Sequence, residues 1–359
     1  MTPLNLAVVG GGHLGRIHTR LTGNLPDTRL IAVVEPDPAN GRKIHDEFGC
    51  EICTDLDQVV ERIDAAIVAS PTVTHADIAG RLLAGGIHVL VEKPLTMAVS
   101  DADRLIADAD RANCVLQTGH VERFNPAFCR AVELCPRGRY FEASRMSGYT
   151  FRSTDVGVVL DLMIHDIDLV CSQVTAPLVD CRAVGISIFG PHEDIAQARL
   201  EFADGSVANL TASRCSFQAA RQISWFAENG FVAANLADGE VQSCTVSDMV
   251  AARDRRDIAE FDDRQQAAIR DSLFETVLPH QSETAPPANA IQQEQLDFLQ
   301  AIRSGRSPRV SGRDGRRAVS VAQSVIDSLA HHRWEDGHSW RVGPQARMLQ
   351  LLPVNARIA

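Results

Sequence analysis

The sequence predicts a two-domain α/β protein in which a doubly wound parallel sheet comes first and a mainly antiparallel sheet follows. Its 359 residues exceed what one small hydrophobic core organises. In the first third, short apolar segments alternate with amphipathic segments of helical period. After Gly119 this alternation stops and tight-turn dipeptides appear. We therefore expect a dinucleotide-binding type of domain over residues 1–118 and a second domain over residues 119–359.

The strands of the first domain are predicted from segments that are apolar throughout. Strands of this kind are typical of parallel sheets that helices cover on both faces. The intervening stretches have helical patterns, which completes the doubly wound arrangement. The predicted strands are Leu4–Val9, Leu30–Val34, Ala65–Ala69, His88–Val91 and Cys114–Thr118.

The second domain is predicted from two hairpin signals. Asp204-Gly205 and Asn229-Gly230 are turn dipeptides, and each lies between two alternating segments. Residues 237–288 show no clear period. Two helices are expected after them, Ala290–Arg303 and Asp314–Ala330.

Composition excludes several classes of protein. The net charge of -11, without a basic stripe, opposes nucleic-acid binding. No apolar run has the length of a membrane span, and no signal sequence precedes the first strand. Nine scattered cysteines indicate reduced thiols and a cytoplasmic location. We expect no metal, and no redox or zinc chemistry at the C-x-x-C of Cys50 and Cys53.

A glycine pattern follows the first strand directly and opens a helix. Gly10, Gly12 and Gly15 have the spacing that binds a dinucleotide pyrophosphate at a helix N-terminus. We assign the intervening His13 and Leu14 to the same cofactor site.

An acidic residue at the end of the second strand indicates which dinucleotide is bound. Glu35 lies twenty residues after Gly15, where a carboxylate accepts hydrogen bonds from the adenosine ribose and repels a 2′-phosphate. This favours NAD over NADP, although the nearby Arg42 leaves NADP open.

Further cofactor contacts are expected at the carboxyl ends of the fourth and fifth predicted strands. Ligands bind at this edge of a parallel sheet. For His75, a local hydrogen bond at a helix start is as good an interpretation as a nicotinamide contact. The predicted residues are Ser70, Pro71, Thr72, His75, Glu92 and Lys93.

Lys93 is unusual for this chain. Only Lys43 and Lys93 are lysines among 35 basic residues. An ammonium can be desolvated and its pKa lowered, whereas a guanidinium stays charged. We therefore predict a catalytic role for Lys93 in stabilising a developing alkoxide.

Asp161, His165 and Asp168 are spaced i, i+4 and i+7 in an apolar segment, which places them on one face of a predicted helix. Oxidation of an alcohol requires a base for the hydroxyl proton, and histidine suits that task near neutral pH. We predict His165 as the general base. Asp161 either orients the imidazole or holds a substrate hydroxyl.

Together, the glycine pattern, Glu92-Lys93-Pro94 and Asp161-x-x-x-His165 resemble the Gfo/Idh/MocA oxidoreductases over nearly the whole chain. The resemblance implies a Rossmann domain, a second α/β domain with a large open sheet, NAD(P) binding and sugar or cyclitol substrates. It also implies a homodimer or homotetramer formed through that sheet. In this family the positions of Lys93, Asp161 and His165 form the catalytic group.

Two segments, residues 119–126 and 155–168, are similar to a narrower branch of that family. Its members oxidise the 3-hydroxyl of UDP-N-acetylglucosamine to a 3-keto sugar, which an aminotransferase converts for the biosynthesis of lipid A-type glycolipids. Arg123, Asn125 and Arg152 are candidate contacts to the diphosphate or the sugar, or else structural partners.

Two alternatives stay open at this point. The chain has Asp155-Val-Gly157 where the common family pattern has a run of glycines, which makes an inositol or free-sugar dehydrogenase a second reading rather than the first. A Rossmann protein can also bind NAD(H) as a regulatory ligand without turnover. The combination of Lys93, Asp161 and His165 argues against such a regulatory protein, because a sensor has no need of a base.

Overall fold

The computed structural model describes residues 2–151, 155–189, 191–247 and 261–332. The chain forms two compact units. The first contains Met1–Phe124 and Asn289–Gln323, and the second contains Asn125–Ala288 and Ser324–Ala359.

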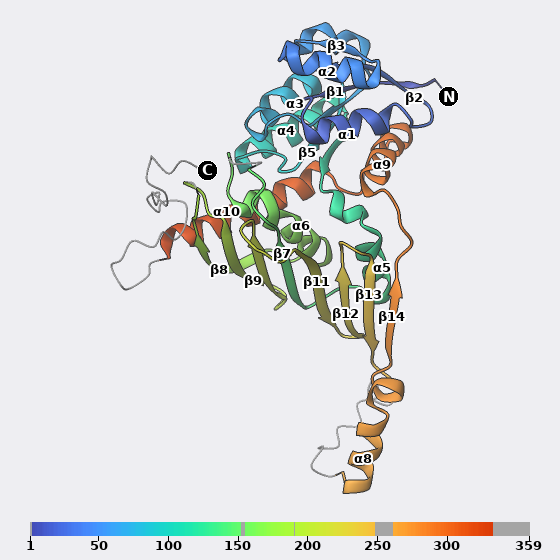
Figure 1. Cartoon of the computed structure of the whole chain (residues 1–359), viewed down its shortest axis with the longest axis vertical. Coiled ribbons are helices and arrows are strands. Elements are labelled where there is room, and N and C mark those ends of the chain that lie inside the picture. Colours follow the sequence, from blue (N-terminus) through green and yellow to red (C-terminus); the bar gives the residue numbers. More distant parts are fainter. Residues whose placement is uncertain (1, 152–154, 190, 248–260, 333–359) are drawn as a thin grey trace, which may run out of the picture. The chain divides into compact units, whose positions relative to one another are not determined.

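The first unit is built on a six-stranded parallel sheet with the strand order β3-β2-β1-β4-β5-β6 (Figure 1). The order reverses beside β1, as in doubly wound dinucleotide-binding sheets. All five strands predicted in this region are present. The strands are β1 Leu4–Val9, β2 Thr28–Val34, β3 Glu51–Cys53, β4 Ala65–Val68, β5 His88–Glu92 and β6 Leu116–Gly119.

Helices pack on both faces of this sheet because successive strand residues point to opposite sides. Ala7 and Val9 belong to one apolar cluster, and Leu6 and Val8 to the other. The helices of the unit are α1 His13–Thr22, α2 Pro38–Phe48, α3 His75–Ala84, α4 Val99–Ala112 and α9 Ala290–Ser304. Short turns of 3-10 helix are η1 Leu56–Gln58, η2 Val60–Arg62, η3 Thr72–Thr74 and η4 Val121–Phe124.

The compact units differ from the two domains expected from the sequence. The division falls after Phe124 rather than after residue 118, and α9 belongs to the first unit together with the start of α10, Gly312–His331. The physical reason is apolar packing: Phe298 and Leu299 of α9 are buried in the core cluster that contains Leu6 and Val8. Helices remote in sequence therefore complete one face of the first sheet.

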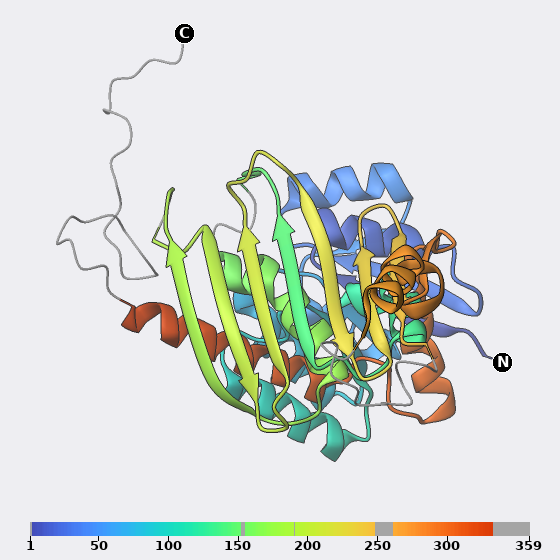
Figure 2. The same cartoon turned by 90° about the horizontal axis from the view of Figure 1, so that it is seen from below.

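The second unit is built on an eight-stranded sheet with the order β14-β13-β12-β11-β7-β10-β9-β8 (Figure 2). Only β10 and β7 pair in parallel, and the other neighbours are antiparallel, which confirms the expected mainly antiparallel sheet. The strands are β7 Tyr140–Met146, β8 Leu178–Ile186, β9 Ile195–Phe202, β10 Val207–Ser213, β11 Ala220–Ala227, β12 Gly230–Asn235, β13 Glu240–Thr245 and β14 His280–Thr284.

Both predicted hairpins are present, at β9–β10 and β11–β12. Their turn glycines have positive φ values, 82° at Gly205 and 145° at Gly230, which other residues rarely adopt. Between β13 and β14, in the stretch without a clear period, lie α8 Asp263–Asp271 and the π turn η7 Leu273–Val277. No residue of α8 is buried, which explains why the segment has no amphipathic pattern.

Helices cover one face of this sheet. In the described part of the unit, α6 Ile164–Gln173 contacts β7 and β10, and α5 Pro126–Leu134 contacts β12 and β13. The opposite face, turned toward the viewer in Figure 2, is lined by polar side chains that include Glu142, Ser144, Asn209 and Gln222. Among the described helices, none is long and apolar enough to cross a membrane.

Candidate active site

The glycine loop between β1 and α1 leaves space for a ligand at Gly12. Gly10 and Gly15 are in close contact with backbone, and Gly11 is in close contact with side chains. Gly10 has φ 103°, and a Cβ there would lie 2.7 Å from the carbonyl oxygen of Ala69. A Cβ on Gly15 would lie 1.8 Å from the Gly10 oxygen. A Cβ on Gly12 would meet nothing within 4 Å. The loop therefore packs tightly on the sheet and opens at Gly12.

The N-terminus of α1 suits a diphosphate. Gly12 is the N-cap, no side chain caps the helix there, and its first turn contains no acidic residue. The exposed N–H groups and dipole of such a helix end attract an anion. His13 and Leu14 begin this helix, as predicted for the cofactor loop. These features fit a bound dinucleotide.

Glu35 lies at the end of β2 and braces the glycine loop. Its Oε2 accepts hydrogen bonds from the Gly11 N–H at 3.0 Å and from Asn40 at 2.8 Å, and its Oε1 accepts from the Asp37 N–H at 2.9 Å. A Cβ on Gly11 would lie 2.6 Å from Oε2. The carboxylate thus orients the loop in addition to standing where the adenosine ribose is expected.

His75 connects two of the predicted cofactor loops and is fully buried. Its Nδ1 lies 2.9 Å from the Pro94 oxygen and its Nε2 lies 2.9 Å from the Ser70 oxygen. Burial lowers the pKa of His75, so the neutral ring donates to one of these two carbonyls. The local interpretation of His75 fits this geometry better than a nicotinamide contact.

The turn after β4 is held by its own side chains. The Ser70 and Thr74 hydroxyl oxygens are 2.7 Å apart, and Thr74 donates to the Pro71 oxygen at 2.7 Å. Pro71 and Thr72 begin the short helix η3. These predicted cofactor residues therefore lie together at the carboxyl edge of the sheet.

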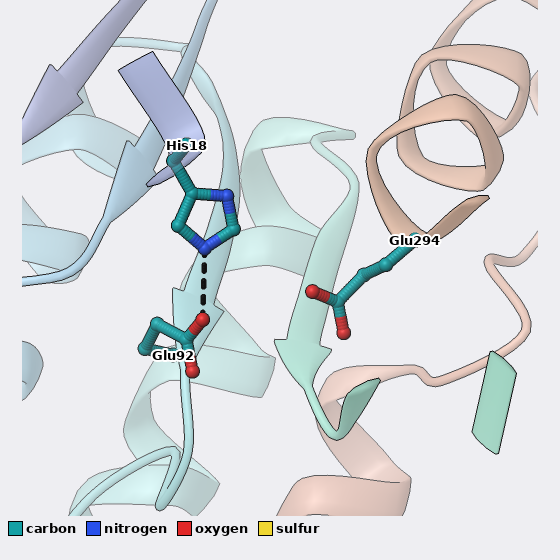
Figure 3. Close-up of side chains that lie close together, drawn as sticks. All are labelled: His18, Glu92 and Glu294. Atoms are coloured by element: carbon teal, nitrogen blue, oxygen red, sulfur yellow. Dashed lines mark hydrogen bonds and ion pairs between the residues drawn. The ribbon is translucent and has the colours of Figure 1, made fainter. Parts of the chain in front are cut away.

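A chain of buried hydrogen bonds reaches the backbone of Lys93 from α9, and Figure 3 shows its middle bond, between His18 and Glu92. The Gln295 amide donates to Nδ1 of His18 at 2.8 Å, so the ring proton lies on Nε2, which is 2.8 Å from Oε1 of Glu92. Oε2 of Glu92 accepts from the Lys93 N–H at 3.2 Å. His18 and Gln295 were not singled out in the sequence, because one polar residue in an amphipathic helix gives no distinguishing signal.

The charge of Glu92 is stabilised by its neighbours. Burial raises the pKa of Glu92, but the His18 hydrogen bond and the charge of Lys93 outweigh burial and lower it below its ordinary value. Glu92 is therefore an anion beside the Lys93 ammonium.

His18, Glu92 and Glu294 also form a group of possible metal ligands, with ligand atoms within 4.8 Å of one another. Figure 3 shows that the His18 ring already points at Glu92 and is bonded to it. Because Nε2 carries the proton in that bond, it is not presented as a metal ligand. The hydrogen-bond chain accounts for the contact between His18 and Glu92.

His120 is a further residue that sequence reasoning missed. It follows β6, next to the paired strand end of Glu92 and Gly119, and its side chain is fully buried. Burial, aided by the charges of Arg123 and Lys93, lowers its pKa to about 3, so the ring is neutral. Within the described residues neither ring nitrogen has a hydrogen-bond partner. The sequence does not show that His120 is buried, because a single histidine after a strand has no distinguishing pattern around it.

The second unit places Asp161 and His165 at the start of the helix that covers its sheet. Both side chains are half-buried, whereas their neighbours Leu160 and Ile164 are buried. The segment is not one regular α-helix as expected: the π turn η5, Val159–Met163, contains Asp161, and α6 starts at Ile164. Such turns change the direction of side chains and are frequent at functional sites. Asp168 is buried and does not share the half-exposed position of the other two.

Buried acidic groups hold the start of this helix. The carboxylate of Glu193 accepts from the Val159 N–H at 3.1 Å, and its backbone oxygen accepts from Val158 at 2.9 Å. Burial raises the pKa of Glu193. A Cβ on Gly157 would lie 2.0 Å from this carboxylate, which explains the glycine in the Asp155-Val-Gly157 sequence.

An ion pair holds the next turn. Arg145 of β7 contacts Asp166 through Nη2 at 2.7 Å and through Nε at 3.1 Å, and both side chains are buried. Because Asp166 directly follows His165, this pair fixes the backbone that carries the predicted base.

The other predicted substrate contacts have structural partners. Asn125 caps α5 by accepting from the Ala127 N–H at 3.0 Å and donates to the Leu236 oxygen at 2.9 Å. Arg123 donates to the Arg309 oxygen at 3.3 Å. Arg152 lies outside the described residues.

The cysteines are all free thiols. Burial raises the pKa of Cys50 and of Cys53, and Glu51 also raises that of Cys53. Raised pKa values oppose the reactive thiolate that redox chemistry needs.

A dinucleotide-binding unit with a lysine at a strand end, and a second unit carrying a histidine and an aspartate at a helix start, are the parts of an NAD-binding oxidoreductase. Comparison with protein families agrees with this class. The model of the oxidoreductase family with an NAD-binding Rossmann fold, Gfo/Idh/MocA, matches residues 4–120, and its C-terminal domain matches residues 132–233. The chain belongs to this family.

Relatives cover nearly the full length. The UDP-N-acetylglucosamine 3-dehydrogenase of Acidithiobacillus ferrooxidans is 30% identical over 90% of this chain and 97% of its own. Its crystal structure superposes with a TM-score of 0.78, at 29% identity over 91% of this chain and 98% of that one. An inositol 2-dehydrogenase of Rhizobium meliloti is 25% identical over 92% of this chain and 98% of its own.

Proposed function

We propose that this protein is an NAD-dependent dehydrogenase that oxidises the 3-hydroxyl of UDP-N-acetylglucosamine to the 3-keto sugar. The observation that carries the proposal is that Asp161 and His165 are half-buried at a helix start where Leu160, Met163 and Ile164 are buried. The nucleotide-sugar substrate is supported by the similarity to the Acidithiobacillus UDP-N-acetylglucosamine 3-dehydrogenase, 97% of whose length aligns with this chain.

In the proposed reaction the sugar carbon loses a hydride and its hydroxyl loses a proton, which leaves a carbonyl. When bound, NAD supplies the hydride acceptor. His165 takes the hydroxyl proton, and Asp161 orients the imidazole or holds a substrate hydroxyl. The ammonium of Lys93 stabilises the developing alkoxide, and Glu92 accepts a hydrogen bond from the Lys93 backbone N–H at 3.2 Å.

The experiment that tests this function measures reduction of added NAD by the purified full chain. UDP-N-acetylglucosamine is compared with N-acetylglucosamine, glucose and myo-inositol. A parallel set contains 2-oxoglutarate to reoxidise tightly held NADH, and there the keto sugar is measured instead of NADH. We expect activity on the nucleotide sugar only. Activity confined to myo-inositol would instead support the second candidate, which the Rhizobium relative favours, and no activity on any substrate would favour a regulatory NAD(H)-binding protein.

We also propose that the enzyme is a cytoplasmic homodimer or homotetramer that supplies a keto sugar to an aminotransferase in lipid A biosynthesis. Nine free thiols with no disulfide are consistent with a reducing compartment. The polar face of the eight-stranded sheet provides uncharged side chains, such as Ser144, Asn209 and Gln222, for hydrogen bonds between copies. Sedimentation velocity of the full chain tests the assembly, and a monomer at micromolar concentration would contradict it.

A further inference from the structure

Three aromatic side chains of the second unit contact one another at the surface. The ring centroids of Tyr149 and Phe151 are 4.8 Å apart, those of Tyr149 and Phe189 are 4.6 Å apart, and those of Phe151 and Phe189 are 6.3 Å apart. Phe151 is 76% exposed and Phe189 is 49% exposed. We call these three residues the aromatic platform.

The backbone of the platform is strained. Phe151 has φ 56°, in the left-handed region that bulky residues seldom occupy. A folded protein retains such a conformation only where its surroundings hold it. Burial of Phe151 does not offset the strain, because most of the residue is exposed. Backbone strain of this kind clusters at active sites and ligand-binding positions.

The platform is anchored to the segment that carries the predicted base. The Arg214 guanidinium lies 5.4 Å from the Tyr149 ring centroid and contacts Asp194 at 2.6 Å. Arg214 also donates to the oxygen of Val156 at 2.9 Å, three residues before the start of the turn that contains Asp161. The platform and this helix start therefore form one connected structure.

Strand pairing places all the platform loops at one end of the sheet. Met146 at the end of β7 pairs with Ser213 at the end of β10, and Ser213 pairs with Ile195 at the start of β9. Tyr149 and Phe151 follow Met146 in the chain, whereas Phe189 precedes Ile195. A ligand on the platform is thus near the same sheet end as the helix start held by Glu193.

We propose that Phe151 and Phe189 stack against the base of a nucleoside diphosphate and thereby select nucleotide sugars over free sugars. This inference rests on the proposed function. The platform offers ring faces, and the cation packed against it is already held by Asp194. Ring faces suit a base, which stacks through its own face, better than a sugar, whose hydroxyls need hydrogen-bond partners.

The test measures the affinity for UDP by isothermal titration calorimetry. It uses the NAD-loaded full chain as wild type, Phe189→Ala and Phe151→Gly. Glycine at position 151 removes the ring and accepts the positive φ, so the Tm is expected to hold or rise. Stacking of one base corresponds to a loss of about tenfold to a hundredfold in UDP affinity. We expect such a loss in each variant, with KM for UDP-N-acetylglucosamine raised and kcat within a few-fold of wild type.

Phe274→Ala is the matched control, because Phe274 is 60% exposed but lies in η7. Its UDP affinity should equal that of wild type. If both platform variants bind UDP as tightly as wild type and still oxidise UDP-N-acetylglucosamine, the base-stacking role of the platform is wrong, whereas the proposed function stands. A wild-type protein that oxidises myo-inositol and does not bind UDP would overturn the proposed function itself. A changed sedimentation coefficient at unchanged UDP affinity would identify the platform as a contact between copies, and would also overturn the inference.

Discussion

The cofactor edge of the first unit and the helix start of the second unit are held by different interactions. At the cofactor edge, glycines in contact with backbone and neutral hydrogen bonds such as those of His75 fix the loops. At the helix start, buried charges do so: Arg145 pairs with Asp166, and Glu193 binds two successive backbone N–H groups through its carboxylate and carbonyl. The comparison teaches that close backbone contacts and individual hydrogen bonds position the glycine loop, whereas a buried ion pair and a buried carboxyl group position the helix start that carries His165, the predicted base.

The largest effect is expected for His165→Ala. Loss of a general base lowers kcat by about 10²–10⁴-fold. NAD affinity, which depends on the first unit, should stay within a few-fold of wild type, and fluorescence titration with NADH measures it. His280→Ala in the exposed strand β14 is the control. A parallel loss of NAD affinity and kcat would show that His165 belongs to the cofactor site instead.

Breaking the buried Arg145–Asp166 ion pair tests whether buried charges hold the helix start of the second unit. Arg145→Met leaves Asp166 buried and uncompensated, which is expected to lower the free energy of unfolding by about 3–5 kcal/mol. The control is Arg139→Met, because the Arg139–Asp204 pair is exposed and contributes about 1 kcal/mol or less. Urea unfolding measures both. Equal losses in the two variants would mean that burial of the pair has no special role.

Lysine and arginine carry the same charge in different shapes, so Lys93→Arg tests whether the compact ammonium is needed at this position. We expect kcat to fall by about a hundredfold, because the larger, planar guanidinium does not place its charge where the ammonium does. Lys43→Arg replaces the other, exposed lysine of the chain and should have wild-type kcat. Near-normal activity of Lys93→Arg would show that any positive charge suffices at position 93.

The smallest effect is expected for His18→Ala, which interrupts the chain from Gln295 to Glu92. The pKa of Glu92 is lowered in the folded protein, so its ionisation adds stability above the unfolded value of about 4.3. That contribution is lost as the pH falls through the lower folded pKa. The variant should lose about 1–3 kcal/mol of unfolding free energy at pH 7.

The pH dependence distinguishes this role from simple packing. The difference between wild type and His18→Ala should narrow as the pH falls from 7 to 4, because burial without the His18 partner raises the pKa of Glu92 in the variant, whose carboxylate is then protonated instead of buried as an unpaired anion. His18→Gln, which retains a donor, should recover part of the loss. A difference that is the same at pH 7 and pH 4 would indicate lost packing rather than a lost partner of Glu92.

Much of the first unit follows from the sequence by itself. Apolar strands, helical periods and the glycine spacing are local patterns, and the sheet order places their carboxyl ends at one edge. Lys93 was found because it departs from the arginine usage of the chain. The turn dipeptides likewise determined both hairpins of the second sheet, because a tight hairpin turn needs a residue with positive φ and glycine adopts it without strain.

The tertiary structure alone decided the remaining features. It assigned α9 to the first unit, converted the segment around Asp161 into a π turn, and used Asn125 as a helix cap. It also joined His18 to Gln295, which are separated by 277 positions in the chain. Long-range packing and buried hydrogen bonds determine these features, and they leave no period or spacing in the sequence because their partners are brought together only by folding.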